Sequence, residues 1–341
     1  MVTAASALAI ASSAVAFHDA DGDGILDEIE EATERSVDTV TFPKPTPFGL
    51  SITSQSSGAK VDDKFHLYFH DGRFQVEYFP NASSNQVAAE FWLELVSLVE
   101  WTDTNGNGLV DDGEVLSVLP LGSDGFGTSP VNVSEWRSLD GGKMSAFDIR
   151  SNGGELHLRL TIAQRFLRVS EGKILTPMEG QLDIWVNHTV RSPAARVGLE
   201  LEIETDEPMA FGTDPWDETN RYSTDESWIS VTGGPAASPS TVFFSWSNGA
   251  AVDGASGRVL MTDPQGSSGS YRMYAIYPAG TSARQSVVHV STLGVVSEAF
   301  QDLIQPVQSL GDPIVFTSSL VAVAAIVSAS MIIAKRRRRK D

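Results

Sequence analysis

The sequence predicts an all-β protein: an antiparallel β-sandwich ectodomain, one large or two joined, with calcium-binding loops and a C-terminal transmembrane helix. Three observations support this fold class. Many short segments alternate apolar and polar residues, two acidic loops have the spacing of calcium sites, and one long apolar run lies near the C-terminus. Period-two alternation is typical of strands that bury one face, and two such sheets bury these faces by packing together.

Composition narrows the class of protein. The chain has 341 residues, is 41% hydrophobic and can therefore form a substantial core. Its formal net charge is −20 although residues 335–341 are strongly basic, so the remainder repels nucleic acid and attracts cations. No cysteine is present, which excludes disulfides and thiolate sites. Bound calcium can provide the missing stabilisation in a secreted protein.

The N-terminal residues resemble a targeting segment. Residues 1–16 are uncharged, small and apolar, and they end in Ala-Val-Ala, which favours a signal peptide cleaved before Phe17. The basic n-region is missing, so a buried N-terminal helix remains the alternative. Residues 17–41 are expected to contain a calcium loop and a short exiting helix over residues 28–37.

Residues 19–30 and 103–114 both fit the twelve-residue EF-hand calcium loop, which requires oxygen ligands at alternate positions and a glycine at position 6. A hard cation needs six to eight oxygens, and a tightly coiled loop can turn them inward. Asp, Asn and Gly also cluster in ordinary turns, but two full-length matches favour Ca²⁺. The predicted ligands are Asp19, Asp21, Asp23, Ile25, Asp27 and Glu30, and Asp103, Asn105, Asn107, Leu109, Asp111 and Glu114, with Ile25 and Leu109 supplying carbonyl oxygens.

The surroundings of the two loops differ from those of a paired EF-hand. No entering helix fits before Asp19, so the first loop resembles the lone calcium loops of thrombospondin type 3 and related surface proteins. The second loop follows residues 87–101, whose pattern fits either a strand from Glu90 or a helix. We favour the strand, and we expect a further strand over residues 115–119 after the loop. Residues 100–114 and 243–254 together resemble a group of uncharacterised secreted or membrane-anchored β proteins with an embedded calcium loop, a resemblance that implies no activity.

Further strands are expected between residues 48 and 296, after a proline-rich linker at residues 42–47. The ectodomain spans residues 42–300, and residues 205–240 contain either a domain boundary or a long loop. The expected strands cover residues 64–69, 73–79, 155–162, 181–186, 196–203, 241–246, 258–261, 271–277 and 286–290.

The C-terminal region predicts a single membrane span. Residues 313–334 carry no charge and, at about 1.5 Å per residue, are long enough to cross the roughly 30 Å core of a bilayer. The basic tail, residues 335–341, then lies in the cytoplasm, and the ectodomain and juxtamembrane residues 301–312 lie outside. A sorting signal replaced by a lipid is an alternative, although no LPxTG or PGF motif precedes the run. Small residues four apart, such as Ala324 and Ser328, allow a homo-oligomer.

Glycosylation sequons begin at Asn81, Asn132 and Asn187 and fit a cell-surface glycoprotein. Four tryptophans are candidates for sugar stacking, although tryptophan in a strand lies more often in the core. They are Trp185, Trp216, Trp228 and Trp246.

The sequence contains no recognisable catalytic motif. Its six histidines lack the HExxH spacing of a zinc site, and no G-x-S-x-G, P-loop or G-x-G-x-x-G is present. We therefore expect a non-enzymatic cell-membrane protein that acts in adhesion, scaffolding or ligand binding, with an extracellular protein or glycan as partner and no nucleic acid. The competing hypothesis is a membrane-anchored extracellular hydrolase of glycans or peptides with structural calcium; a cleft with converging carboxylates or a Ser–His pair would favour it.

Overall fold

The computed structural model describes residues 27–42, 49–56, 62–127, 131–137, 141–170, 173–192, 194–213, 226–235, 239–262, 264–267 and 269–297. The predicted signal peptide, most of the first calcium loop, the linker at residues 43–47, the juxtamembrane segment, the membrane span and the basic tail lie outside these residues. Within the described ranges, no helix has the length and apolar character needed to cross a membrane.

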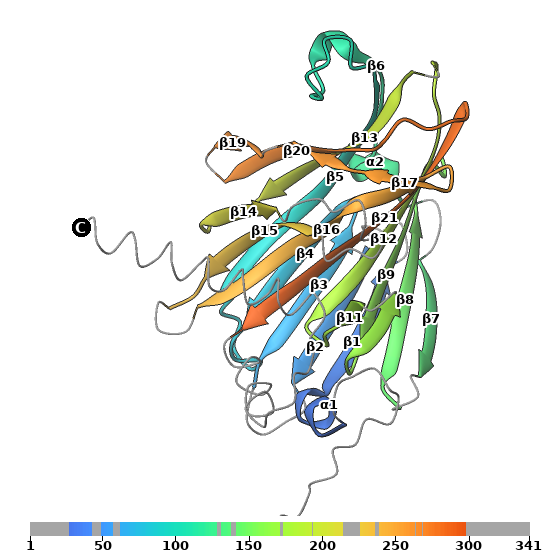
Figure 1. Cartoon of the computed structure of the whole chain (residues 1–341). Helices are drawn as coiled ribbons and strands as arrows, with labels where there is room; N and C mark the ends of the chain where they lie inside the picture. Colours follow the sequence, from blue (N-terminus) through green and yellow to red (C-terminus); the bar gives the residue numbers. More distant parts are fainter. Residues whose placement is uncertain are drawn as a thin grey trace, which may run out of the picture.

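The chain forms two antiparallel sheets that pack face to face, which confirms the all-β sandwich (Figure 1). The first sheet has the order β1-β2-β3-β4-β5-β13-β20-β18, with β6 on β5 and β19 on β20. Its strands are β1 (Arg35–Phe42), β2 (Gly49–Ser56), β3 (Lys64–His70), β4 (Arg73–Phe79), β5 (Ala89–Trp101), β6 (Val115–Pro120), β13 (Arg196–Glu204), β18 (Leu260–Met261), β19 (Gln265–Ser267) and β20 (Ser270–Ile276).

The second sheet has the order β14-β15-β16-β21-β12-β9-β8-β7, with β17 on β16. Its strands are β7 (Asn132–Arg137), β8 (Lys143–Arg150), β9 (Leu156–Ala163), β12 (Glu179–Thr189), β14 (Met209–Thr213), β15 (Glu226–Gly233), β16 (Ser240–Val252), β17 (Ala255–Arg258) and β21 (Arg284–Ser297). The remaining elements are α1 (Asp27–Thr33), η1 (Asp112–Glu114), α2 (Gly122–Gly125) and the hairpin of β10 (Leu167–Ser170) and β11 (Lys173–Leu175).

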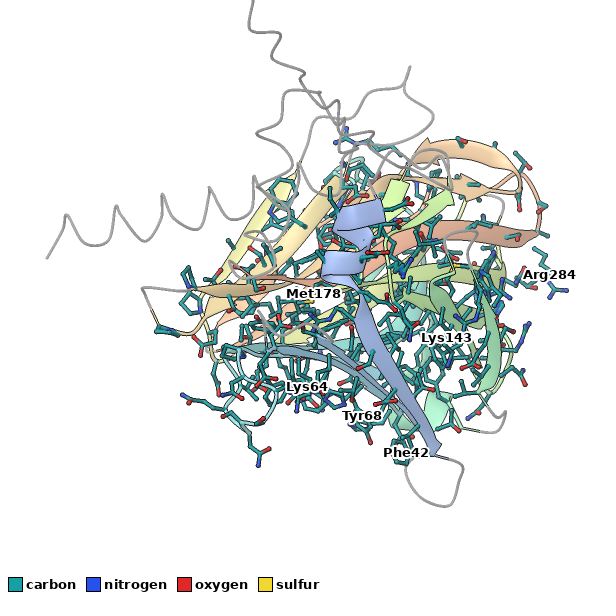
Figure 2. The ribbon with its side chains drawn as sticks, turned by 90° about the horizontal axis from the view of Figure 1, so that it is seen from below. Phe42, Lys64, Tyr68, Lys143, Met178 and Arg284 are labelled. Atoms are coloured by element: carbon teal, nitrogen blue, oxygen red, sulfur yellow. The ribbon has the colours of Figure 1, made fainter. Side chains whose placement is uncertain are left out.

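One hydrophobic core lies between the sheets. Each sheet contains strands from before and after residues 205–240, and inward residues of both belong to one continuous cluster, so the described chain is one sandwich. Met178 is buried within it, whereas Phe42, Lys64 and Tyr68 lie along the outer side of the first sheet (Figure 2). Of the four candidate tryptophans, Trp246 is in the core, Trp185 and Trp228 are half-buried, and Trp216 lies outside the described residues.

Several boundaries differ from the sequence-based expectation. The helix expected to reach Val37 ends at Thr33, because Arg35 turns inward and the following residues alternate as strand β1. The strand expected over residues 258–261 is divided between the sheets: β17 pairs with β16, and β18 pairs with β20. The chain crosses at buried Val259, whose N–H donates to the Asn248 carbonyl.

The ambiguous segment at residues 87–101 is a strand, as favoured. In β5 the alternation is interrupted by a bulge near Ser97, where the pairing with β13 shifts. The shift turns Glu100 into the protein, where it is only 1% exposed, although simple alternation places it on the outer face. Beyond the bulge, β5 leads into the second predicted calcium loop.

Candidate functional site

The second predicted calcium loop connects two neighbouring strands of the first sheet. β5 and β6 pair antiparallel up to Trp101 and Val115, and the loop between them is teal and lies near the β6 label at the upper end of the sandwich in Figure 1. Gly106 and Gly108 have φ values of +74° and +73°, a left-handed conformation that favours glycine. The predicted order of strand, coiled loop and strand is confirmed.

Glu114, the last predicted ligand, is buried and joins the two ends of this loop by hydrogen bonds. Glu114 is 5% exposed, and its Oε1 accepts hydrogen bonds from Thr104 N at 2.7 Å, Thr104 Oγ1 at 2.6 Å and Asn105 N at 3.0 Å. Its Oε2 and Asp103 Oδ1 are both buried, and neither has a hydrogen-bond partner among the described residues. A buried carboxylate oxygen without a donor costs about 1–3 kcal/mol or more, which a cation would offset.

Three further predicted ligands meet at one point. The amide nitrogens of Asn105 and Asn107 both donate to Asp111 Oδ2 at 2.9 Å. The Asn107 Oδ1 accepts the Leu109 N–H at 2.8 Å, so the side chain also holds the backbone turn. Rotating each amide by half a turn would direct its oxygen to the same point, at the cost of the bonds that these oxygens accept from the Asn107 and Leu109 N–H groups.

The carboxylates of this loop are not gathered around one centre. Across the described ranges, no three His, Asp or Glu side chains are arranged to hold a metal. Asp103 Oδ2 lies 4.0 Å from Arg196 Nη1, which draws it toward β13. The buried carboxylate oxygens and the converging amides are the kinds of ligand that a hard cation prefers. Binding of a cation would require Asp103, Asp111 and Glu114 to move closer together.

The first predicted loop is described only at its end. Asp27 begins α1, and Glu30 is fully buried on the same side of the helix as Ile29 and Thr33. Asp19, Asp21, Asp23 and Ile25 lie outside the described residues, so this site remains a prediction.

The outer face of the first sheet carries a second group of candidate side chains. Arg73 on β4 lies with its guanidinium carbon 5.2 Å from the Trp92 ring centroid. The same guanidinium contacts Glu94 on β5 at 3.2 Å and Glu204 on β13 at 2.6 Å. The cationic guanidinium of Arg73 therefore lies between an aromatic ring and carboxylates from two strands.

A hollow of about 310 Å³ opens beside this cluster. Its walls include Glu90, Trp92, Glu204, Thr205 and Asp206. Burial and the nearby Glu77 carboxylate raise the pKa of Glu90, because both disfavour its charged form. Sequence analysis missed this hollow, because only the strand register brings Glu204 opposite Trp92.

The three sequons have different environments. Asn81 is exposed in the turn after β4, where its Oδ1 accepts the Ser83 N–H, and Asn132 is exposed at the start of β7. Asn187 is half-buried in β12. Their use as glycosylation sites remains a prediction.

The fold and the two groups of residues define a β-sandwich with a coiled polar loop at one end and an acidic, aromatic hollow on one face. No protein-family model matches the chain, and no curated protein resembles it significantly.

Proposed function

We propose that this chain is a calcium-stabilised, single-pass cell-surface protein that acts in adhesion, scaffolding or ligand binding. The observation that carries this proposal is the position of residues 103–114. The loop directly joins two paired strands, and it buries the carboxylate oxygens Asp103 Oδ1 and Glu114 Oε2 without donors among the described residues. A cation at this place acts on the sheet and not on a pair of sensor helices.

A bound calcium ion would add a constraint at the end of the first sheet where β5 extends beyond β4. β4 pairs with β5 only as far as Glu94, and β6 takes over the same side of β5 from Ser97 onward. In the described sheet β6 pairs with β5 alone, and its residues are half-buried or exposed. Calcium would bind the folded loop much more tightly than the unfolded chain. Its binding would therefore stabilise the connection between β5 and β6 by mass action.

The ligand-binding part of the proposal is supported by the outer face of the first sheet. The hollow beside Trp92 lies at the lower limit of about 300 Å³ for small-ligand sites and combines an aromatic wall with polar groups. The cell-surface location is supported by the predicted span at residues 313–334 and the basic tail that follows it.

The melting temperature of the full chain should rise in calcium. Extracellular calcium sites bind at about 10⁻⁴ to 10⁻³ M, so 10 mM calcium should stabilise the fold by roughly 1.4–2.7 kcal/mol per site relative to chelator. This corresponds to a shift of several degrees. Asp103→Ala should remove part of the shift, because it deletes one ligand carboxylate of the described loop. Differential scanning calorimetry in calcium and in chelator measures both effects.

Asp38→Ala is the matched control, since Asp38 is an exposed carboxylate on β1 outside both loops. This variant should retain the complete calcium shift. A wild-type melting curve that is the same in calcium and in chelator would refute the proposal, and so would an undiminished shift in Asp103→Ala.

A further inference from the structure

Three polar residues on adjacent strands of the first sheet form a continuous hydrogen-bonded relay. His66 on β3 places Nε2 2.9 Å from Ser51 Oγ on β2 and Nδ1 2.7 Å from Glu77 Oε2 on β4. His66 and Glu77 are directly opposite in the strand register, and Ser51 is diagonal to His66. A nucleophile, a base and an orienting carboxylate at these distances are the parts of a catalytic triad.

The partners determine which way the protons point. A carboxylate only accepts hydrogen bonds, so in the neutral imidazole Nδ1 carries the proton that Glu77 accepts. Nε2 is then the acceptor, and Ser51 Oγ–H must be its donor. This polarity is the one in which a histidine can take the proton of a serine as general base.

The relay is both held in place and open to solvent. Gln75 Nε2 donates to the second oxygen of Glu77 at 2.9 Å, which fixes the carboxylate toward His66. The side chains of His66 and Glu77 are 24% and 15% exposed, and both face outward from the sandwich. The next outward residue across the sheet from Glu77 is Glu90, which lines the hollow. β2 and β5 are three strand spacings of about 4.8 Å apart, roughly 14 Å, so the acyl carbon that Ser51 attacks lies outside the hollow.

The geometry points to Ser51, His66 and Glu77 as an acyl-transfer site that hydrolyses esters. Ser51 Oγ attacks the acyl carbon while its proton passes to His66 Nε2, and the carbonyl π electrons move onto oxygen. When the intermediate collapses, the C–O bond to the leaving alcohol breaks, and the alcohol takes the proton from His66. Water then attacks the acyl-Ser51 ester in the same manner and releases the carboxylic acid and free Ser51. This activity goes beyond ligand binding and gives the competing hydrolase hypothesis specific residues.

The position of Ser51 limits the substrates. β2 is paired on both sides, so its backbone N–H groups are engaged in the ladders and do not form an oxyanion hole. Tyr68 is directly opposite Ser51, and its side chain carries a hydroxyl donor on the same outward face. One oxyanion donor contributes about 10²–10³ in rate, so activated esters with good leaving groups are the expected substrates.

The test uses the full chain with a fluorophosphonate probe and p-nitrophenyl acetate. We expect the probe to label Ser51, as mapped by peptide mass spectrometry, and ester hydrolysis to exceed that of Ser51→Ala. His66→Gln should lower both by about 10²-fold, because it removes the general base. Ser36→Ala removes an exposed hydroxyl on neighbouring β1 without contact to a histidine, and it should change neither. Melting curves of the variants verify that each one is folded.

Two results would overturn the inference: no label at Ser51 under conditions that label a known serine hydrolase, or equal labelling in folded wild type and His66→Gln. Either would reduce the relay to ordinary cross-strand hydrogen bonds that stabilise the sheet. The calcium shift is a separate measurement, so failure here would leave the calcium proposal standing.

Discussion

Replacing Asp63 by alanine is expected to lower the free energy of unfolding by about 3–5 kcal/mol. Asp63 and Arg35 form an ion pair at 2.7 Å, and their side chains are 1% and 2% exposed. Asp63 also accepts the Tyr78 hydroxyl at 2.9 Å, and Arg35 donates to Ser54 Oγ at 2.9 Å. Removing the carboxylate leaves a buried guanidinium without its counter-charge. Urea unfolding of wild type and variant measures the loss.

Two variants separate this explanation from a general sensitivity of the segment. Asp62→Ala changes the neighbouring exposed carboxylate and should cost little. The double replacement Arg35→Met with Asp63→Leu should cost less than Asp63→Ala alone, because apolar residues of similar volume often substitute for a buried pair. A loss below about 1 kcal/mol in Asp63→Ala would contradict the burial argument.

Acid should destabilise the fold through His289. Burial lowers the pKa of His289 to about 4, while the ring stays hydrogen-bonded to the Ser247 carbonyl at 2.8 Å. The ordinary value is about 6.5, so between these limits the unfolded chain binds a proton that the folded chain does not. Stability is therefore complete above about pH 6.5 and falls by about 1.4 kcal/mol per unit as the pH decreases toward 4.

The measurement compares unfolding free energies of wild type and His289→Gln at pH 7.5 and pH 5, above the range in which most carboxylates titrate. Wild type should lose about 2 kcal/mol more than the variant over this interval. His70→Gln, on the outer end of β3, serves as the control and should follow wild type. If His289→Gln and wild type lost equal amounts, the buried histidine would not be the source of the acid sensitivity.

Local patterns were sufficient to predict many of the sheet-forming segments. Alternation placed β3, β4 and β13 within one or two residues, and the Asp71–Gly72 turn between β3 and β4 has the positive φ values its sequence favours. His66 and His70 both lie in β3. These features depend on neighbours in the chain.

Features that depend on distant pairing could not be predicted. β1 was missed because residues 28–37 have a helix-forming composition, and Arg35 is held in the strand by Asp63, 28 positions away. β7 was missed because all six of its residues are exposed at the edge of the sheet, which leaves no alternation to detect. The relay from Ser51 to Glu77 exists only in one register of three strands.

The predicted calcium loop at residues 103–114 depends partly on local sequence and partly on distant pairing. Spacing predicted its glycine turn and the meeting of Asn105, Asn107 and Asp111, because all are set within twelve residues. The ion pair between Asp103 and Arg196 involves another strand, so the spacing of the loop residues could not predict it. Local spacing therefore sets the loop, and one of its three carboxylates contacts another strand.

Calorimetric titration of the purified full chain with calcium tests the central claim most directly. The first loop has five predicted ligand carboxylates and the second has three, so two classes of site are expected, with the weaker at about 10⁻⁴ to 10⁻³ M. Asp103→Ala should lose the weaker class, and Asp19→Ala the tighter one. Identical isotherms for wild type and Asp103→Ala would contradict the account of residues 103–114 as a calcium clamp between β5 and β6.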